Sequence, residues 1–301
     1  MTFKALRTPD ACFEDLPGFN FKPHYITDLP GYDGLRVHYL DEGPPDANRT
    51  FVCLHGQPTW SYLYRKMIPV FLETGARVIC PDWLGFGRSD KPLEDTTYGF
   101  HFHRDMMIAL IARLDLQNVT LVCQDWGGII GLTLPVDMPD RFDRLLVMNT
   151  ALATGSSLGA GFDAWRAFCK SRPDLDIAGL MQRGTPILDA TEAAAYAAPF
   201  PDATYKAGVR RFPDMVMTAP DMEGVTTSRR AANWWRNHWT GKSFMAVGGA
   251  DPVLGPPIMA ALRQNIRNCP PPMLIEEAGH FVQEWGESIA RQALTHWGDR
   301  S

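Results

Sequence analysis

One acidic residue, Asp125, stands where the chain could hold a nucleophile. An apolar and β-branched run at 119–123 precedes it, and Gly127 and Gly128 follow it before a second apolar run. This order predicts a strand, a sharp turn and a helix, with the Asp125 side chain presented at the turn. Such a turn often carries serine, whereas a carboxylate is already ionised at neutral pH and needs no base to activate it. An aspartate can equally cap a helix that begins at Trp126, and this stretch alone does not separate the two interpretations.

Two further residues occupy comparable positions later in the chain. Asp251 follows the apolar run 242–248, and His280 follows the run 273–277. A nucleophile, an acid and a histidine in this order match the catalytic triad of α/β-hydrolases. A single aspartate before a proline is ordinarily a turn residue, and a single histidine is ordinarily structural. Three such residues after three separate predicted strands favour a triad.

Backbone N–H groups that could stabilise a negatively charged intermediate are expected on both sides of Asp125. One belongs to Trp126, the residue after the nucleophile. The other lies in the loop 55–58 (HGQP), directly after the apolar run 50–54. An ordinary Gly-Pro turn would explain that loop as well, but its position after a buried strand favours Gln57 as the second donor.

The elements that must position these residues alternate along the chain. Strands are predicted at 35–41, 50–54, 77–82, 119–123, 144–149, 242–248 and 273–277, and helices at about 60–73, 102–116, 126–139, 258–265 and 282–297. The alternation predicts a parallel sheet covered by helices on both faces. Residues 1–34 are expected to be irregular, and the polar–apolar alternation of 35–41 predicts a strand with one solvated face.

The alternation stops between residues 152 and 221, where short helical patterns at 162–169 and 191–197 replace it. Ligands of open α/β sheets bind beyond the carboxyl ends of the strands, so an insert placed there would cover the site. We therefore predict a core of residues 1–151 and 222–301 and a helical cap domain of residues 152–221.

Composition restricts the partners. The chain has 301 residues, of which 45% are hydrophobic and 21% charged, and a net charge of −5. It has no basic cluster for nucleic acid, no apolar run of about 20 residues for a membrane span, and no secretory signal at its start. Its six cysteines lack paired spacing. Buried free thiols and a cytoplasmic location are therefore expected, without metal ligands.

Four segments make the sequence resemble the haloalkane dehalogenases over nearly its whole length. They are 55–60 (HGQPTW), 85–92 (GFGRSDKP), 124–128 (QDWGG) and 278–284 (AGHFVQE). The match is closest to the subfamily typified by the dichloroethane-degrading enzyme, which binds halide with two tryptophans. The resemblance implies an α/β-hydrolase fold with a mostly parallel eight-stranded sheet flanked by helices and an inserted helical cap. It also implies hydrolysis of small halogenated substrates to an alcohol, a halide ion and a proton, without a cofactor. We further expect a monomer.

By this resemblance Asp125 is the nucleophile, His280 the base that activates water, and Asp251 the acid that orients it. Trp126 and Trp165 would bind the leaving halide through their indole N–H groups. The substrate pocket would be lined by Phe162, Phe212, Pro213, Val216 and Leu254.

Neutral donors suit the chemistry that the resemblance implies. Displacement of a halide by a carboxylate moves negative charge onto the leaving group, and a cation beside Asp125 would also restrain the nucleophile. An indole N–H donates without accepting. One departure from the family is Gln57, which stands where glutamate is expected.

Three rival functions share parts of this pattern. An epoxide hydrolase uses the same fold and an aspartate nucleophile, but normally protonates its substrate with two cap tyrosines. Tyr196 and Tyr205 are the only tyrosines of residues 152–221, and neither stands in a recognised motif for that role. A serine esterase would need serine at the turn, and a non-catalytic ligand-binding protein would not need a base.

Overall fold

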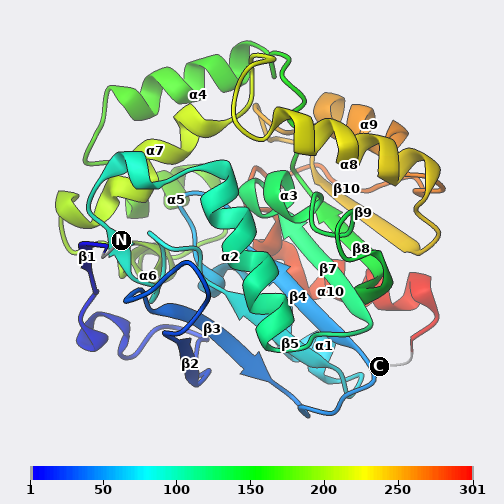
Figure 1. Cartoon of the computed structure of the whole chain (residues 1–301), viewed down its shortest axis with the longest axis horizontal. Helices are drawn as coiled ribbons and strands as arrows, with labels where there is room; N and C mark the ends of the chain where they lie inside the picture. The colour runs from blue at the N-terminus through cyan, green and yellow to red at the C-terminus, as the bar shows by residue number, and fades with distance from the viewer. Residues whose placement is uncertain (1–2, 300–301) are drawn as a thin grey trace.

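An eight-stranded sheet forms the centre of the computed structural model, which describes residues 3–299 (Figure 1). Its strands are, in spatial order, β10 (Met273–Ile275), β9 (Lys242–Gly248), β8 (Phe142–Met148), β7 (Val119–Gln124), β4 (Thr50–Leu54), β5 (Arg77–Pro81), β3 (Val37–Glu42) and β2 (Pro23–Ile26). Neighbours from β10 to β5 pair in parallel, whereas β3 runs antiparallel to both β5 and β2. The predicted mostly parallel sheet is confirmed. A separate two-stranded sheet pairs β1 (Ala5–Leu6) with β6 (Lys91–Pro92).

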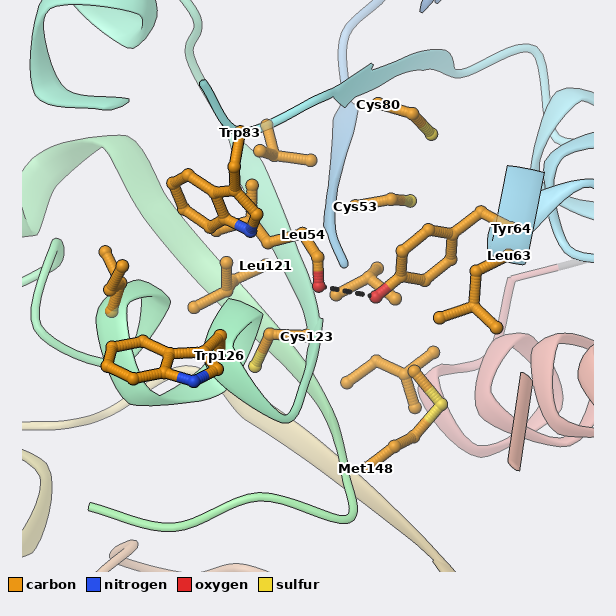
Figure 2. Close-up of a cluster of buried hydrophobic side chains, with 14 of the residues drawn as sticks. Cys53, Leu54, Leu63, Tyr64, Cys80, Trp83, Leu121, Cys123, Trp126 and Met148 are labelled. Carbon is orange, nitrogen blue, oxygen red and sulfur yellow. Dashed lines mark hydrogen bonds between the residues drawn. The ribbon is translucent and has the colours of Figure 1, made fainter. Parts of the chain in front are cut away.

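Helices cover both faces of this sheet, as parallel strands require. In Figure 1, α2 (Phe100–Arg113) and α3 (Trp126–Gly131) lie in front of it, and α1 (Ile68–Leu72) and α10 (Gly286–Trp297) lie behind it. All residues of β4 and β7 are buried. Figure 2 shows part of this core, where the Tyr64 hydroxyl donates to the Leu54 carbonyl oxygen over 2.8 Å.

The segment between β8 and β9 is helical, as predicted. It contains α4 (Ala160–Lys170), α5 (Ile177–Gly184), α6 (Ala190–Ala197), α7 (Ala207–Met215) and α8 (Val225–Asn237). In Figure 1, α4 and α7 lie above α3, the helix that follows Asp125. The chain then returns to the core along α8, where the Trp235 indole donates to the Leu132 carbonyl oxygen over 2.6 Å.

Several predicted helices are shorter or divided in the structure. The helix predicted at 126–139 ends at Gly131, because the ring of Pro135 would clash with the carbonyl group four residues earlier. The helix predicted at 60–73 divides into η2 (Ser61–Tyr64) and α1. The last predicted helix divides into η6 (Val282–Trp285) and α10. The remaining helices are η1 (Asp10–Phe13), η3 (Asp95–Thr97), η4 (Pro139–Arg141), η5 (Ala203–Lys206) and α9 (Pro256–Gln264).

Two expectations about the first strands are wrong. Residues 1–34 were expected to be irregular, but they contain β2, an edge strand whose first residue is Pro23. An edge position tolerates proline, because the missing N–H need not enter a ladder. The strand predicted to have one solvated face, β3, is buried at its first four residues. His38 can be buried there because its Nδ1 bonds to Asp82 Oδ2 over 2.6 Å. Among residues 3–299, no helix is long and apolar enough to cross a membrane.

Candidate active site

A strained turn presents Asp125 at the carboxyl end of β7. Its φ of 51° and ψ of −126° are unusual for a residue with a side chain. The turn is tight because α3 approaches β4 closely. A Cβ atom on Gly127 would lie 1.9 Å from the Leu54 carbonyl oxygen, so only glycine fits there. The sequence pattern of strand, turn and helix therefore places the carboxylate at the turn, as predicted.

The two carboxylate oxygens of Asp125 have different surroundings. Oδ1 accepts a hydrogen bond from the backbone N–H of Gln57 over 2.8 Å. Gly56 permits this approach, since a Cβ there would lie 2.2 Å from Oδ1. Oδ2 lies 3.5 Å from Nε2 of His280. Oδ1 is thus held by the loop after β4, and Oδ2 is left to react.

The other two predicted triad residues, Asp251 and His280, contact each other beside Asp125. Nδ1 of His280 is 2.8 Å from Oδ2 of Asp251. Asp251 also accepts from the side-chain amide of Asn149 and from the backbone N–H groups of Val253 and Leu254. Burial raises the pKa of Asp251, but the His280 imidazole and these hydrogen bonds outweigh burial and lower it to about 2. Asp251 is therefore an anion that can fix the orientation of the imidazole.

The imidazole of His280 lies between two carboxylates. Burial lowers the pKa of His280, but Asp251 and Asp125 together outweigh burial and raise it to about 10. Part of this increase comes from the charge on Asp125. The basicity of His280 therefore depends on whether Asp125 is ionised.

A residue that sequence reasoning did not assign, Gln124, also contacts His280. Its Nε2 lies 2.9 Å from Nε2 of His280 and 3.1 Å from the His280 carbonyl oxygen. The side chain of Gln283 donates in turn to Oε1 of Gln124 over 3.3 Å. Both glutamines are fully buried. The available signal was a polar residue at the end of an otherwise apolar strand.

A cavity of about 420 Å³ opens in front of the Asp125 carboxylate. Asp125, Asp251 and His280 line it, with Trp126 from α3 and Trp165 from α4. Four of the five predicted pocket residues also line it, namely Phe162, Pro213, Val216 and Leu254. The structure brings the predicted triad, both predicted halide-binding tryptophans and most of the predicted pocket to one place.

The fifth predicted pocket residue, Phe212, is not among the residues that line the cavity. Its ring is fully buried and packs against the Trp126 ring, with 4.9 Å between the ring centroids. It also packs against Phe86 and His103. Phe212 therefore packs against Trp126 without lining this cavity, unlike the other four predicted pocket residues.

The tryptophans differ in what their indole N–H groups bind. Four donate to protein acceptors: Trp60 to Ala195, Trp83 to His55, Trp235 to Leu132 and Trp239 to Ser243. Trp126 and Trp165 line the cavity, and neither donates to an acceptor within residues 3–299. Two neutral donors are thus available at the cavity for an anion.

The two tyrosines of residues 152–221 do not meet the requirement of an epoxide hydrolase. Tyr196 is fully buried, and its hydroxyl donates to Glu284 away from the cavity. Tyr205 is absent from the cavity lining, as is every other tyrosine of the described residues. An epoxide bound beside Asp125 would therefore lack the tyrosine acid that such an enzyme uses.

Comparison with known proteins covers nearly the whole chain. Residues 49–287 match the family model of the alpha/beta hydrolase fold. A haloalkane dehalogenase from Psychrobacter cryohalolentis is 45% identical over 96% of this chain and 96% of its own length. One from Mycolicibacterium paratuberculosis is 41% identical over 96% of this chain and 97% of its own.

A solved haloalkane dehalogenase structure is also similar to this chain. Haloalkane dehalogenase DpaA from Paraglaciecola agarilytica NO2 is 53% identical with a TM-score of 0.96, and the match covers 97% of this chain and 98% of DpaA. The DpaA structure is described as tetrameric. That description is at odds with the monomer expected for this chain.

Proposed function

This chain belongs to the haloalkane dehalogenase family of the α/β-hydrolase fold, and on that premise we propose that it acts through an ester on Asp125. One observation carries the proposal. The Asp125 carboxylate has one oxygen on the Gln57 N–H and the other facing His280, in a cavity with two indole donors. A nucleophile, a base and an anion site are thus combined.

In the first step, Oδ2 of Asp125 attacks the carbon that bears the halogen. The new carbon–oxygen bond forms as the carbon–halogen bond breaks, and the halide leaves with the bonding electrons. The indole N–H groups of Trp126 and Trp165 stabilise the charge that develops on the halogen. Donors already oriented in a cavity with a mostly apolar lining are effective in such a step, because they need not reorganise.

In the second step, a water molecule gives a proton to Nε2 of His280 and attacks the ester carbonyl carbon. The resulting oxyanion on Oδ1 is stabilised by the backbone N–H groups of Gln57 and Trp126. The tetrahedral intermediate then releases the alcohol, which takes the proton from His280. Because the ester on Asp125 carries no charge, one cause of the high pKa of His280 is removed before this step. His280 can therefore accept a proton when it is needed.

Residues 152–221 are proposed to form a cap domain over the core of residues 1–151 and 222–301. The contribution of α4 and α7 to the cavity supports this division. The two-tryptophan subfamily is proposed on two grounds. Both tryptophans line the cavity. The proposed triad acid follows β9, whereas in other subfamilies of the family it follows the preceding core strand, which here is β8 and is followed by Asn149. Six free cysteines support a reducing, cytoplasmic environment.

The assembly of this chain is proposed to follow that of DpaA. Its similarity to a protein described as a tetramer, at 53% identity, supports an oligomer. Light scattering on the purified chain would measure the mass directly. A mass equal to one chain of 33.6 kDa would restore the monomer.

The variant His280→Gln tests the chemical scheme. It keeps a polar side chain but removes the base, so alkylation should proceed while hydrolysis stops. After exposure to a bromoalkane, mass spectrometry should find the alkyl group on the peptide that contains Asp125, with about one bromide released per enzyme. The variant Asp125→Asn serves as the control and should form no adduct. An unmodified Asp125 peptide in His280→Gln would contradict the ester mechanism, and diol formation from an epoxide by the wild type would favour the rival.

A further inference from the structure

The side chain of Gln124, the residue directly before Asp125, contacts the imidazole of His280. It ends β7 directly before Asp125, and its amide reaches His280, which lies 156 residues further along the chain. Its Nε2 contacts both the ring Nε2 and the carbonyl oxygen of His280. Such a contact at the reacting nitrogen bears directly on the protonation of the base.

The orientation of this amide follows from its neighbours. A carbonyl oxygen can only accept a hydrogen bond, so the Gln124 atom at 3.1 Å from the His280 oxygen must be the donor, Nε2. The Gln283 amide donates to the opposite atom, Oε1 of Gln124, at 3.3 Å. Reversing the Gln124 amide would place two oxygens against each other. Its second N–H therefore points at Nε2 of His280, over 2.9 Å.

Only an unprotonated Nε2 can accept this hydrogen bond. We propose that Gln124 is a positioning residue for the hydrolytic step, which holds His280 with Nε2 unprotonated beside the ester on Asp125. This inference rests on the proposed ester mechanism. Asp251 accepts from Nδ1 on the other side of the ring, so the two contacts together select one tautomer of His280.

The carboxylates around His280 favour its protonated form, whereas Gln124 favours the unprotonated form. Asp251 and Asp125 both raise the pKa of the imidazole. Among the described residues that line the cavity, Arg183 of α5 and Glu277 are the only charged residues besides Asp125, Asp251 and His280. When Asp125 is esterified, its charge is lost. Of the groups bonded to the imidazole, only Asp251 then favours the protonated form of His280, and Gln124 favours the unprotonated form. The amide thus favours the basic form of His280 when water must be deprotonated.

The variant Gln124→Met tests this role, because methionine has a similar length and no donor. Rapid mixing with a bromoalkane, followed by mass spectrometry, gives the rates of alkylation and of ester hydrolysis separately at each pH. Without the donor, His280 should protonate more readily. The pH below which ester hydrolysis slows should therefore rise by about one pH unit. The rate of alkylation should stay close to that of the wild type. Gln264→Met, at an exposed position on α9, is the matched control.

Two outcomes would overturn the inference. One is an unchanged pH profile of hydrolysis in Gln124→Met, and the other is an equal slowing of both steps, which a merely structural role predicts. If Gln124→Met does not fold, Gln283→Met can replace it, because it removes the partner that orients the Gln124 amide. This variant should shift the pH dependence of hydrolysis in the same direction by a smaller amount. No shift in folded Gln283→Met would also overturn it. Failure of the ester mechanism is distinguishable, because the wild type would then form no adduct on Asp125.

Discussion

Trp126 and Trp165 are positioned at the cavity in different ways. A local turn places Trp126, and the packing of a distant segment places Trp165. Trp126 directly follows Asp125, the proposed nucleophile, so the turn that presents Asp125 also places the indole at the cavity. Trp165 lies on α4, in the segment between β8 and β9, and is half-buried. Its place at the cavity depends on how that segment packs. The two donors are therefore independent in the sequence and act together only in the folded chain.

Replacing Trp165 with phenylalanine should weaken halide binding while it keeps most of the apolar lining. A hydrogen bond to a charged group contributes about 1.5–3 kcal/mol, so the dissociation constant for bromide should rise by about ten- to hundredfold. Quenching of the remaining tryptophan fluorescence by bromide would measure it. Trp234→Phe, on α8 and outside the cavity lining, should leave the constant unchanged. Equal affinities in Trp165→Phe and the wild type would remove Trp165 from the halide site.

The site residues that the sequence alone predicts are those that directly follow a predicted strand. Asp125, Asp251 and His280 each follow a predicted strand, and parallel strands bring their carboxyl ends to one edge. Trp165 required the family resemblance, because no local pattern fixes it. Gln124 was missed as a functional residue, since its contact with His280 appears only when distant strands lie side by side.

At the scale of elements, buried strands were the most predictable feature. The strands β4, β5 and β9 fall where continuous apolar runs stand, because a parallel sheet buries both of its faces. Helix ends were less predictable, since α3 ends at Gly131 under the influence of a proline four residues later. The edge strand β2 has no apolar run of its own, and pairing with β3 determines it.

Conformational strain at the turn before α3 has a clear structural support. Asp125 keeps its positive φ because the strand before it and the helix after it are both buried in the core. Thr150 adds a hydrogen bond from its hydroxyl to the Asp125 carbonyl oxygen over 2.7 Å. Asp125 is thus held by packing on β4, β7 and Thr150, and a Cβ atom on Gly127 or Gly128 would collide with Leu54 or Thr150.

At the scale of the whole molecule, a buried ionic cluster joins the segment between β8 and β9 to the core. Arg65, which follows η2, forms two hydrogen bonds with Glu284 of η6, at 2.7 and 2.8 Å. It also bonds to Glu192 of α6 over 2.8 Å, and Tyr196 of α6 donates to the same Glu284. Glu284 lies four residues after His280, so this cluster connects α6 to the segment that carries His280.

Removal of Arg65 should therefore destabilise the protein more than the loss of a surface ion pair. In Arg65→Met, Glu284 stays buried and keeps only Lys66 as a cationic partner among the described residues, at 2.8 Å. A buried charge left with no partner costs about 3–5 kcal/mol, so with Lys66 still beside Glu284 the loss should be smaller than that, and urea unfolding would measure it as a lower free energy of unfolding. Arg291→Met is the matched control and should change it little, because Arg291 and its partner Glu73 are exposed.

The double variant Arg65→Met/Glu284→Met distinguishes the effect of the buried Glu284 charge from the effect of lost packing. Replacing both partners with apolar side chains removes the buried carboxylate, so more than half of the lost free energy of unfolding should return. If the double variant is as unstable as Arg65→Met, the arginine acts through its packing on the Tyr62 ring, which lies 4.1 Å from the guanidinium carbon. If Arg65→Met unfolds at the same urea concentration as Arg291→Met, the cluster does not stabilise the contact between α6 and the core.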